Sequence, residues 1–196
     1  MHIFIEGYDN NVYFNDFGRF SVTASVFIDN KEAVFFVGIG GIGMSGVAQY
    51  FLSQGYAVAG YDRVLTPLTQ RLVSLGAHIS DVDAPTAIPT LFRDPKNTKV
   101  VYTPAIPANS PLLTYFKDKG FVLEKRAAVI GEISHTMPCL AVAGTHGKTT
   151  TSSMLTVALQ ACGLDPSFAI GGTLTSSGSN AHRGTGDLFI AEADES

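Results

Sequence analysis

The chain has 196 residues, of which 45% are hydrophobic and 15% charged, and its formal net charge is −4. This composition is typical of a soluble globular protein of one or two domains, and it lacks the basic excess of a nucleic-acid-binding protein. The sequence has no signal peptide and no apolar run of the roughly 18 residues that a membrane helix needs, so we expect a cytoplasmic protein without nucleic-acid or membrane partners.

Residues 1–33 contain no motif that indicates a catalytic or binding site. Two stretches in them, at 11–16 and 20–28, alternate apolar and polar residues as edge strands do. We expect either a β-hairpin or a stretch foreign to the protein there, in an N-terminal extension whose role the pattern does not define.

An α/β domain is predicted for residues 34–137, where short apolar runs alternate with amphipathic stretches. The first pair is AVFFVG at 33–38 and MSGVAQYFLSQG at 44–55, and the alternation continues to AAVIGEISH at 127–135. Strands that are apolar on both faces and alternate with helices are typical of a parallel sheet covered on both sides.

Helix boundaries in this domain have clear signals. Thr66 and Ser110 each precede a proline, and we expect them to cap helices that Gly76 and Gly120 end. The local chemistry therefore agrees with the hydrophobic pattern.

A glycine-rich loop follows the first strand of the domain. The stretch VGIGGIGMSG places Gly38, Gly40 and Gly43 in G-x-G-x-x-G spacing, where backbone N–H groups can approach a diphosphate at the start of a helix. Asp62 ends the second strand, where a dinucleotide-binding domain holds a ribose hydroxyl. The alternatives are an ordinary strand-to-helix turn and a solvated carboxylate.

A second loop, GTHGKTT, runs from Gly144 to Thr150 between a buried strand and a helix that Gly163 ends. Its N–H groups can form an anion nest, Lys148 can reach the β- and γ-phosphates, and the Thr149 hydroxyl can ligate Mg²⁺. Val142 stands where the common phosphate-loop motif has glycine, so the match is to a shorter variant.

Residues 138–196 are predicted to begin a second α/β domain. Strands are expected at 138–144, 166–172 and 187–191, with a polar Gly/Ser loop at 173–183. About three strands are too few to close a phosphate-loop sheet, so we expect the chain to be a fragment of a longer protein. The two cysteines, Cys139 and Cys162, are expected to be buried thiols.

The acidic stretch AEADES follows the last predicted strand and contains Glu192, Asp194 and Glu195. A carboxylate at this strand end, beside the phosphate loop, is placed to be a second Mg²⁺ ligand or to orient water. The alternative is a solvated acidic terminus.

The stretches GIGGIGMSG, AGTHGKTTT, GGTLTSSGSNA and AEADES, in this order, closely resemble the motifs of the Mur ligases of peptidoglycan synthesis. The resemblance covers about residues 34–196 and is strongest to the member that joins L-alanine to UDP-N-acetylmuramate. It implies a Rossmann-like UDP-sugar-binding domain at 34–137 and, at 138–196, the first part of a P-loop ATPase domain. A third domain, for ATP and the amino acid, is also implied.

The resemblance also implies roles for individual residues. The UDP-sugar, in place of NAD, would be bound by Gly38, Gly40, Gly41, Ile42, Gly43, Asp62 and Thr103, with Asn180 and His182 reaching it from the second domain. ATP would be bound by Gly144, Thr145, His146, Gly147, Lys148, Thr149 and Thr150. Lys148 would neutralise charge on the transferred phosphoryl group, and Thr149 and Glu192 would hold Mg²⁺. For Asn180 and His182 an ordinary polar loop is the alternative, and His146 is equally consistent with an exposed loop residue.

The reaction implied is transfer of the ATP γ-phosphoryl group to the substrate carboxylate, followed by attack of the L-alanine amine on the acyl phosphate. We expect no ligase activity from this chain alone. Two alternatives stay open: a UDP-sugar-binding module without chemistry, and the related ligase that adds a whole peptide. An NAD-dependent oxidoreductase would leave the phosphate loop unused, and a P-loop kinase would leave the first domain unexplained.

Overall fold

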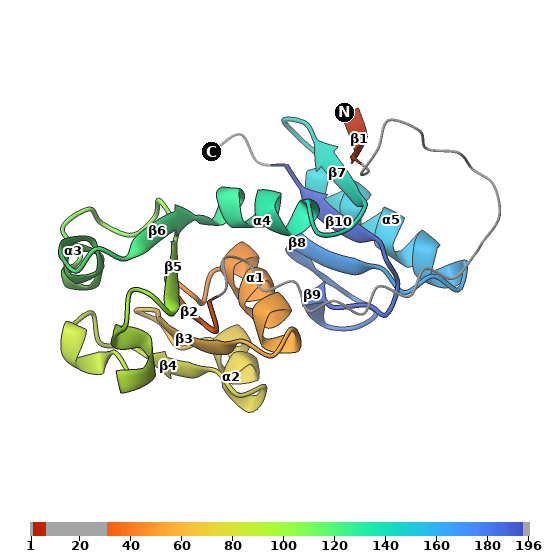
Figure 1. The fold of residues 1–196 in the computed structure, drawn as a ribbon. Helices are drawn as coiled ribbons and strands as arrows, with labels where there is room; N and C mark the ends of the chain where they lie inside the picture. Colours follow the sequence, from red (N-terminus) through yellow and green to blue (C-terminus); the bar gives the residue numbers. More distant parts are fainter. Residues whose placement is uncertain (1, 7–30, 194–196) are drawn as a thin grey trace. The chain divides into compact units, whose positions relative to one another are not determined.

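The computed structural model describes residues 2–6 and 31–193 and forms two compact units (Figure 1). The division falls between residues 129 and 130, inside helix α4 (Arg126–Ser134), and it groups the N-terminal strand with the C-terminal part of the chain. We call residues 31–129 the first unit and residues 2–6 with 130–193 the second unit. The hairpin predicted at 11–16 and 20–28 lies outside the described residues.

The first unit contains a five-stranded sheet in which every pair of neighbours is parallel. Val37 at the end of the central strand lies opposite Tyr61 and Tyr102, so three strand ends meet at one edge. The strands, in spatial order, are β4 (His78–Ser80), β3 (Ala57–Tyr61), β2 (Ala33–Val37), β5 (Thr98–Tyr102) and β6 (Val122–Lys125). The parallel α/β fold predicted for this part of the chain is confirmed.

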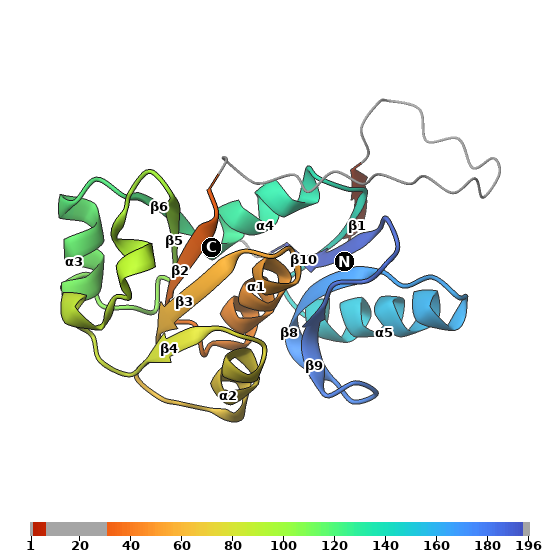
Figure 2. The ribbon, with the colours of Figure 1, turned by 60° about the horizontal axis from the view of Figure 1, so that its bottom comes forward.

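Both faces of this sheet are covered, and the central strand β2 is therefore buried at every position. Phe35 packs against Phe92 and Phe116 on one face, with ring centroids 6.1 and 5.0 Å away, whereas Phe36 packs against Phe51 on the other face. Figure 2 shows the helices that form the two layers. They are α1 (Ile42–Ser53), α2 (Pro67–Ser74), α3 (Pro111–Asp118) and the short 3₁₀ turns at Pro85–Ala87 and Thr90–Arg93.

The predicted helix caps are confirmed. Thr66 forms a capping box with Thr69, and the Ser110 side chain accepts a hydrogen bond from the Leu113 N–H. Gly76 and Gly120 follow the two helices with φ of +103° and +75°, a conformation that only glycine adopts at little cost.

The second unit contains a mixed five-stranded sheet, whose three inner strands are parallel and whose two edge strands are antiparallel. The strands, in spatial order, are β1 (His2–Glu6), β7 (Cys139–Ala143), β10 (Phe189–Glu192), β8 (Ser167–Leu174) and β9 (Ser179–His182). Helix α5 (Lys148–Ala161) packs through Leu155 and Leu159 on a buried cluster that includes Phe168 and Ile190. None of the helices in the described ranges has the length and apolar character needed to cross a membrane.

Two expectations for the second unit are wrong. The predicted loop at 173–183 contains the end of β8 and the whole of β9, because Ala181 pairs with Ala169 and is buried despite its polar neighbours. Cys139 is buried as expected, but Cys162 is exposed because it caps the C-terminal end of α5.

We predict that Phe116→Ala destabilises the first unit by about 3–5 kcal/mol, because the side chain is fully buried between Phe35 and Phe121. Urea unfolding followed by circular dichroism measures this difference. Lys117→Ala, at the next and exposed position of α3, is the control and should change stability by less than about 0.5 kcal/mol. Equal effects of the two substitutions would contradict the assignment of Phe116 to the core.

Candidate functional site

The glycine-rich loop joins β2 to α1 and turns within four residues at the carboxyl edge of the first sheet. Gly38 has φ of +91°, and a Cβ at this position would lie 2.7 Å from Cγ2 of Thr103. Glycine is therefore required there for its conformation and for its close contact with the loop that follows β5. The structure brings Thr103 to the glycine loop, at the rim where the sequence placed it.

All four amide N–H groups of residues 38–41 already donate hydrogen bonds within the protein. Two reach the carbonyl oxygen of Tyr61, at 2.8 and 3.0 Å, and one reaches Oδ2 of Asp62 at 2.7 Å. The fourth lies 3.5 Å from the carbonyl oxygen of Gly38. Amides that could meet a ligand are those of Gly43 and Met44 in the first turn of α1, where helix geometry provides no acceptor within the helix.

Asp62 is held by the backbone on both carboxylate oxygens. Oδ2 accepts the Gly40 N–H, and Oδ1 accepts the Val64 N–H at 3.1 Å. The side chain thus braces the glycine loop against the end of β3. Its predicted contact with a ribose hydroxyl stays a prediction.

Gly43 lies in the first turn of α1, directly beneath the side chain of Arg126. A Cβ on Gly43 would overlap Nη1 of the Arg126 guanidinium group. Ile42, at the start of the same helix, is 45% exposed. The sequence reasoning missed Arg126, although a basic pair, Lys125 and Arg126, stands at the start of a predicted helix.

The phosphate loop joins β7 to α5 in the second unit. Gly147 is the N-cap of α5 and has φ of +78°, so it turns the chain directly into the helix. Nζ of Lys148 donates a hydrogen bond to the carbonyl oxygen of Gly144 at 2.8 Å, which folds the lysine back over the loop. Four other loop residues predicted to bind nucleotide are exposed to solvent, namely Thr145, His146, Gly147 and Thr150.

The hydroxyl of Thr149 and the carboxylate of Glu192 meet beside this loop. Thr149 Oγ1 lies 3.2 Å from Glu192 Oε2, and Oε1 of the same carboxylate accepts the Gly171 N–H at 2.9 Å. Three elements, α5, β10 and β8, therefore converge on one group of oxygen atoms. The structure brings together the two residues that were predicted to hold Mg²⁺.

These oxygen donors suit Mg²⁺, a hard cation that proteins bind through one or two oxygen ligands together with phosphates and water. In the described ranges, no group of three or more His, Cys, Asp or Glu side chains could hold a metal ion. Asp194 and Glu195 lie outside the described residues. The donor set thus fits a metal shared with a phosphate ligand better than an all-protein metal cage.

Gly171 and Gly172 were not singled out in the sequence, yet both pack against this group. A Cβ on Gly171 would lie 2.8 Å from Oε2 of Glu192, and one on Gly172 would lie 2.6 Å from Cγ2 of Thr149. The GG pair was visible in the sequence as part of GGTLTSSGSNA, but its contacts depend on the pairing of β8 with β10.

Asn180 and His182 lie on β9, the edge strand. Asn180 is fully buried, whereas His182 is exposed and its Nε2 lies 2.9 Å from Oδ1 of Asp165. Asp165 also accepts a hydrogen bond from the Thr185 N–H at 2.8 Å. This hydrogen bond lowers the pKa of Asp165 most, and the hydrogen bond to His182 lowers it further. The predicted contacts of Asn180 and His182 with substrate stay predictions.

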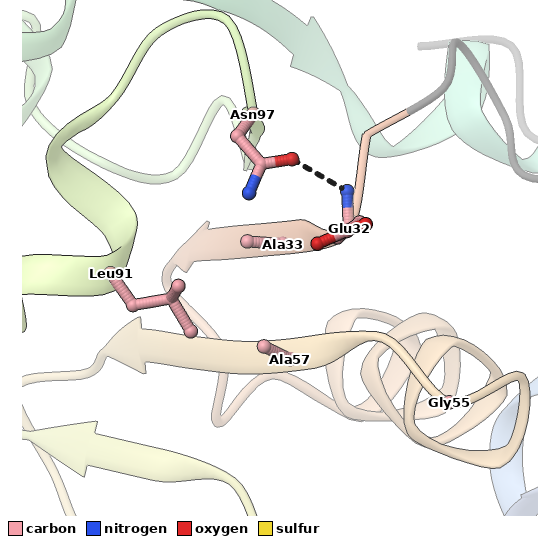
Figure 3. Close-up of a pocket in the computed structure, with 6 residues that line it drawn as sticks. All are labelled: Glu32, Ala33, Gly55, Ala57, Leu91 and Asn97. Carbon is pink, nitrogen blue, oxygen red and sulfur yellow. Dashed lines mark hydrogen bonds between the residues drawn. The ribbon is translucent and has the colours of Figure 1, made fainter.

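A cavity of about 250 Å³ lies at the opposite, amino edge of the first sheet (Figure 3). It is lined by Glu32, Ala33, Gly55, Ala57, Leu91 and Asn97, and the Glu32 N–H donates to Oδ1 of Asn97 across it. Ligands of open α/β sheets bind at the carboxyl ends of the strands, so this cavity is not the candidate site.

The chain is similar to known ligases. The model described as Mur ligase family, catalytic domain, matches residues 33–137. A UDP-N-acetylmuramate–L-alanine ligase of Parabacteroides distasonis is 47% identical over 169 residues, which are 86% of this chain and 37% of that protein. An enzyme of the same name from Acidothermus cellulolyticus is 47% identical over 170 residues, covering 82% of this chain and 32% of that protein. The chain thus spans about a third of the length of the curated relatives it matches.

Solved structures with similar folds include two ligases. One is the UDP-N-acetylmuramate:L-alanyl-gamma-D-glutamyl-meso-diaminopimelate ligase of Neisseria meningitides, with a TM-score of 0.74 and 28% identity over 84% of this chain and 53% of that chain. The other is a UDP-N-acetylmuramate–alanine ligase of Thermotoga maritima, with a TM-score of 0.72 and 29% identity over 82% of this chain and 37% of that chain. The Rossmann-like fold class predicted from the sequence is confirmed.

We predict that Gly171→Ala weakens divalent-metal binding by about 10-fold, because the added methyl group displaces the Glu192 carboxylate from Thr149. Electron paramagnetic resonance of Mn²⁺, titrated in the presence of ATP, measures the affinity. Gly131→Ala, in α4, is the matched control because a Cβ there meets nothing within 4 Å. Equal Mn²⁺ affinities of Gly171→Ala and the unchanged chain would contradict the prediction.

We predict that Asp165→Asn lowers the melting temperature at pH 7 by about 1–3 °C, a small effect because the carboxylate is partly exposed. The pKa of Asp165 is lower in the folded chain than in the unfolded chain, so its stabilisation is present above about pH 4 and is lost as the pH falls. The difference between the two melting temperatures should therefore shrink in acid. A difference that stays constant from pH 7 to pH 3 would contradict this account, and Asp118→Asn on the exposed side of α3 serves as the control.

Proposed function

This chain belongs to the Mur ligase family, and on that premise we propose that it provides the UDP-sugar-binding domain and the phosphate loop of an ATP-dependent ligase. The ligase joins L-alanine to UDP-N-acetylmuramate and releases ADP. The names of the curated relatives support L-alanine as the acceptor.

The observation that carries this proposal is the approach of Thr149 to Glu192 at the start of α5. The hydroxyl and carboxylate lie 3.2 Å apart, next to a lysine that begins the helix behind a strand-to-helix glycine loop. Such an arrangement is typical of a site that binds Mg²⁺ together with the phosphates of a nucleotide. A binding domain without chemistry would not require it.

In the proposed reaction, the carboxylate of the UDP-sugar takes the γ-phosphoryl group of ATP, and the amine of L-alanine then displaces phosphate to form the amide. Lys148 neutralises negative charge on the phosphoryl group, for which its side chain must leave the carbonyl oxygen of Gly144. Thr149 and Glu192 would hold Mg²⁺, which would supply charge stabilisation to the phosphates. The Gly171 N–H holds one oxygen of Glu192, so the other oxygen stays directed at Thr149.

We propose further that the 196-residue chain binds substrate without turning it over, since it spans only 37% of the length of the relative from Parabacteroides distasonis. Alanine-dependent release of ADP by the purified chain would contradict this part of the proposal. The second candidate function is the ligation of a peptide to the same UDP-sugar, which is favoured by the similarity to the Neisseria meningitides structure.

We predict that UDP-N-acetylmuramate binds to the chain in a calorimetric titration and that NAD does not. Gly40→Val should reduce the UDP-sugar affinity at least about 10-fold, because its Cβ would lie 2.8 Å from Oδ2 of Asp62 and disturb the loop. Mg-ATP titrated into the same variant, with circular dichroism, reports whether the second unit remains folded. Binding of NAD, or an unchanged UDP-sugar affinity in Gly40→Val, would overturn the proposal.

A further inference from the structure

Charge is unevenly distributed along the carboxyl edge of the first sheet. Asp62, Asp81 and Asp83 follow the ends of β3 and β4, whereas Lys125 and Arg126 stand at the end of β6. Burial, reinforced by the Asp83 and Asp62 carboxylates, raises the pKa of Tyr61 at the end of β3. Asp83 accepts hydrogen bonds from Ser110 and Leu112 at the start of α3, which leaves Asp62 and Asp81 as the carboxylates on the β3–β4 side and Lys125 and Arg126 as cations at the β6 side. An anionic ligand is therefore favoured on the β6 side.

The glycine loop itself supplies little of the attraction that a diphosphate needs. The amides of residues 38–41 donate to acceptors in the protein, and one of those acceptors is the Asp62 carboxylate. A phosphate next to Gly40 would therefore meet a negative charge instead of a free donor. Compensating positive charge has to come from outside the loop.

The guanidinium group of Arg126 lies over the first turn of α1. It covers Gly43, with Cζ 2.9 Å and Cδ 3.3 Å from the position that a Cβ of Gly43 would occupy. The side chain is half-buried, so its long stem is held in place by packing.

Two helices begin at this point, α1 at Ile42 and α4 at Arg126 itself, and neither has an acidic residue in its first turn. Helix N-termini carry partial positive charge, which disfavours a cation and attracts an anion. A guanidinium group in this position adds a full positive charge to these partial charges, which favours an anion further. Because its donors form a planar fork, arginine also matches phosphate oxygens better than lysine does.

We propose that Arg126 binds the diphosphate of the sugar nucleotide and directs it toward the β6 side of the sheet edge, away from Asp62. The inference rests on the proposed function, because it takes the glycine loop to be the UDP-sugar site. It adds a binding residue that no motif in the sequence identified. It also explains why residue 43 is glycine, since any side chain there would displace the guanidinium group.

The test compares the affinities of UDP-N-acetylmuramate, UDP and uridine for the unchanged chain, Arg126→Gln and Arg126→Lys. Arg126→Gln keeps most of the aliphatic stem but removes the charge, and it should weaken UDP-N-acetylmuramate and UDP by about 10- to 100-fold. Uridine, which lacks phosphate, should bind to it as it does to the unchanged chain. Arg126→Lys should lose less, because it retains the charge without the forked donors.

Lys96→Ala is the charge-matched control, because it removes an exposed cation at the opposite edge of the same unit. Unchanged UDP affinity in Arg126→Gln, or an equal loss in Lys96→Ala, would overturn the inference. An equal loss of uridine binding would also overturn it, because Arg126 would then act only through the fold. If the unchanged chain binds none of the three ligands, the proposed function fails, and the inference fails with it.

Discussion

Both candidate sites depend on one backbone constraint, the reversal of a buried strand into a helix within four residues. Gly38 and Gly147 make this turn with φ of +91° and +78°, values that side-chain-bearing residues rarely adopt. Each turn occurs at the carboxyl end of a parallel strand, where the loops of neighbouring strands meet. At these edges, residues from distant segments meet: Thr103 lies beside Gly38 in the first unit, and Glu192 lies beside Thr149 in the second.

Both units also share a hydrogen bond of the same kind: a glycine N–H donates to a carboxylate at the end of a neighbouring strand. Asp62 accepts the Gly40 N–H in the first unit, and Glu192 accepts the Gly171 N–H in the second. Asp62 uses its other oxygen for the backbone of Val64, so it acts as a brace. Glu192 instead presents its other oxygen to Thr149, and this difference is what makes it a fitting metal ligand.

The hydrogen bonds of the glycine loop explain why its G-x-G-x-x-G spacing alone did not distinguish an NAD site, a UDP-sugar site and an ordinary turn. The spacing describes how the chain turns, but the amides that it brings to the edge are occupied by Tyr61 and Asp62. Selectivity for an anion then depends on charges from other elements, such as Arg126 at the end of β6. These charges cannot be located from the loop sequence because they reach it only through the fold.

The sequence by itself determined the local features of this protein. Alternating apolar runs predicted the parallel sheet, Thr66 and Ser110 marked helix starts, and the spacing of GTHGKTT located the phosphate loop, because each of these signals acts between residues close in the chain. The tertiary structure alone decided the strand β9, the contacts of Gly171 and the position of Arg126 over Gly43. Those features arise from pairings between segments that are far apart in the sequence, and burial or close contact is set there by the partner and not by the residue itself.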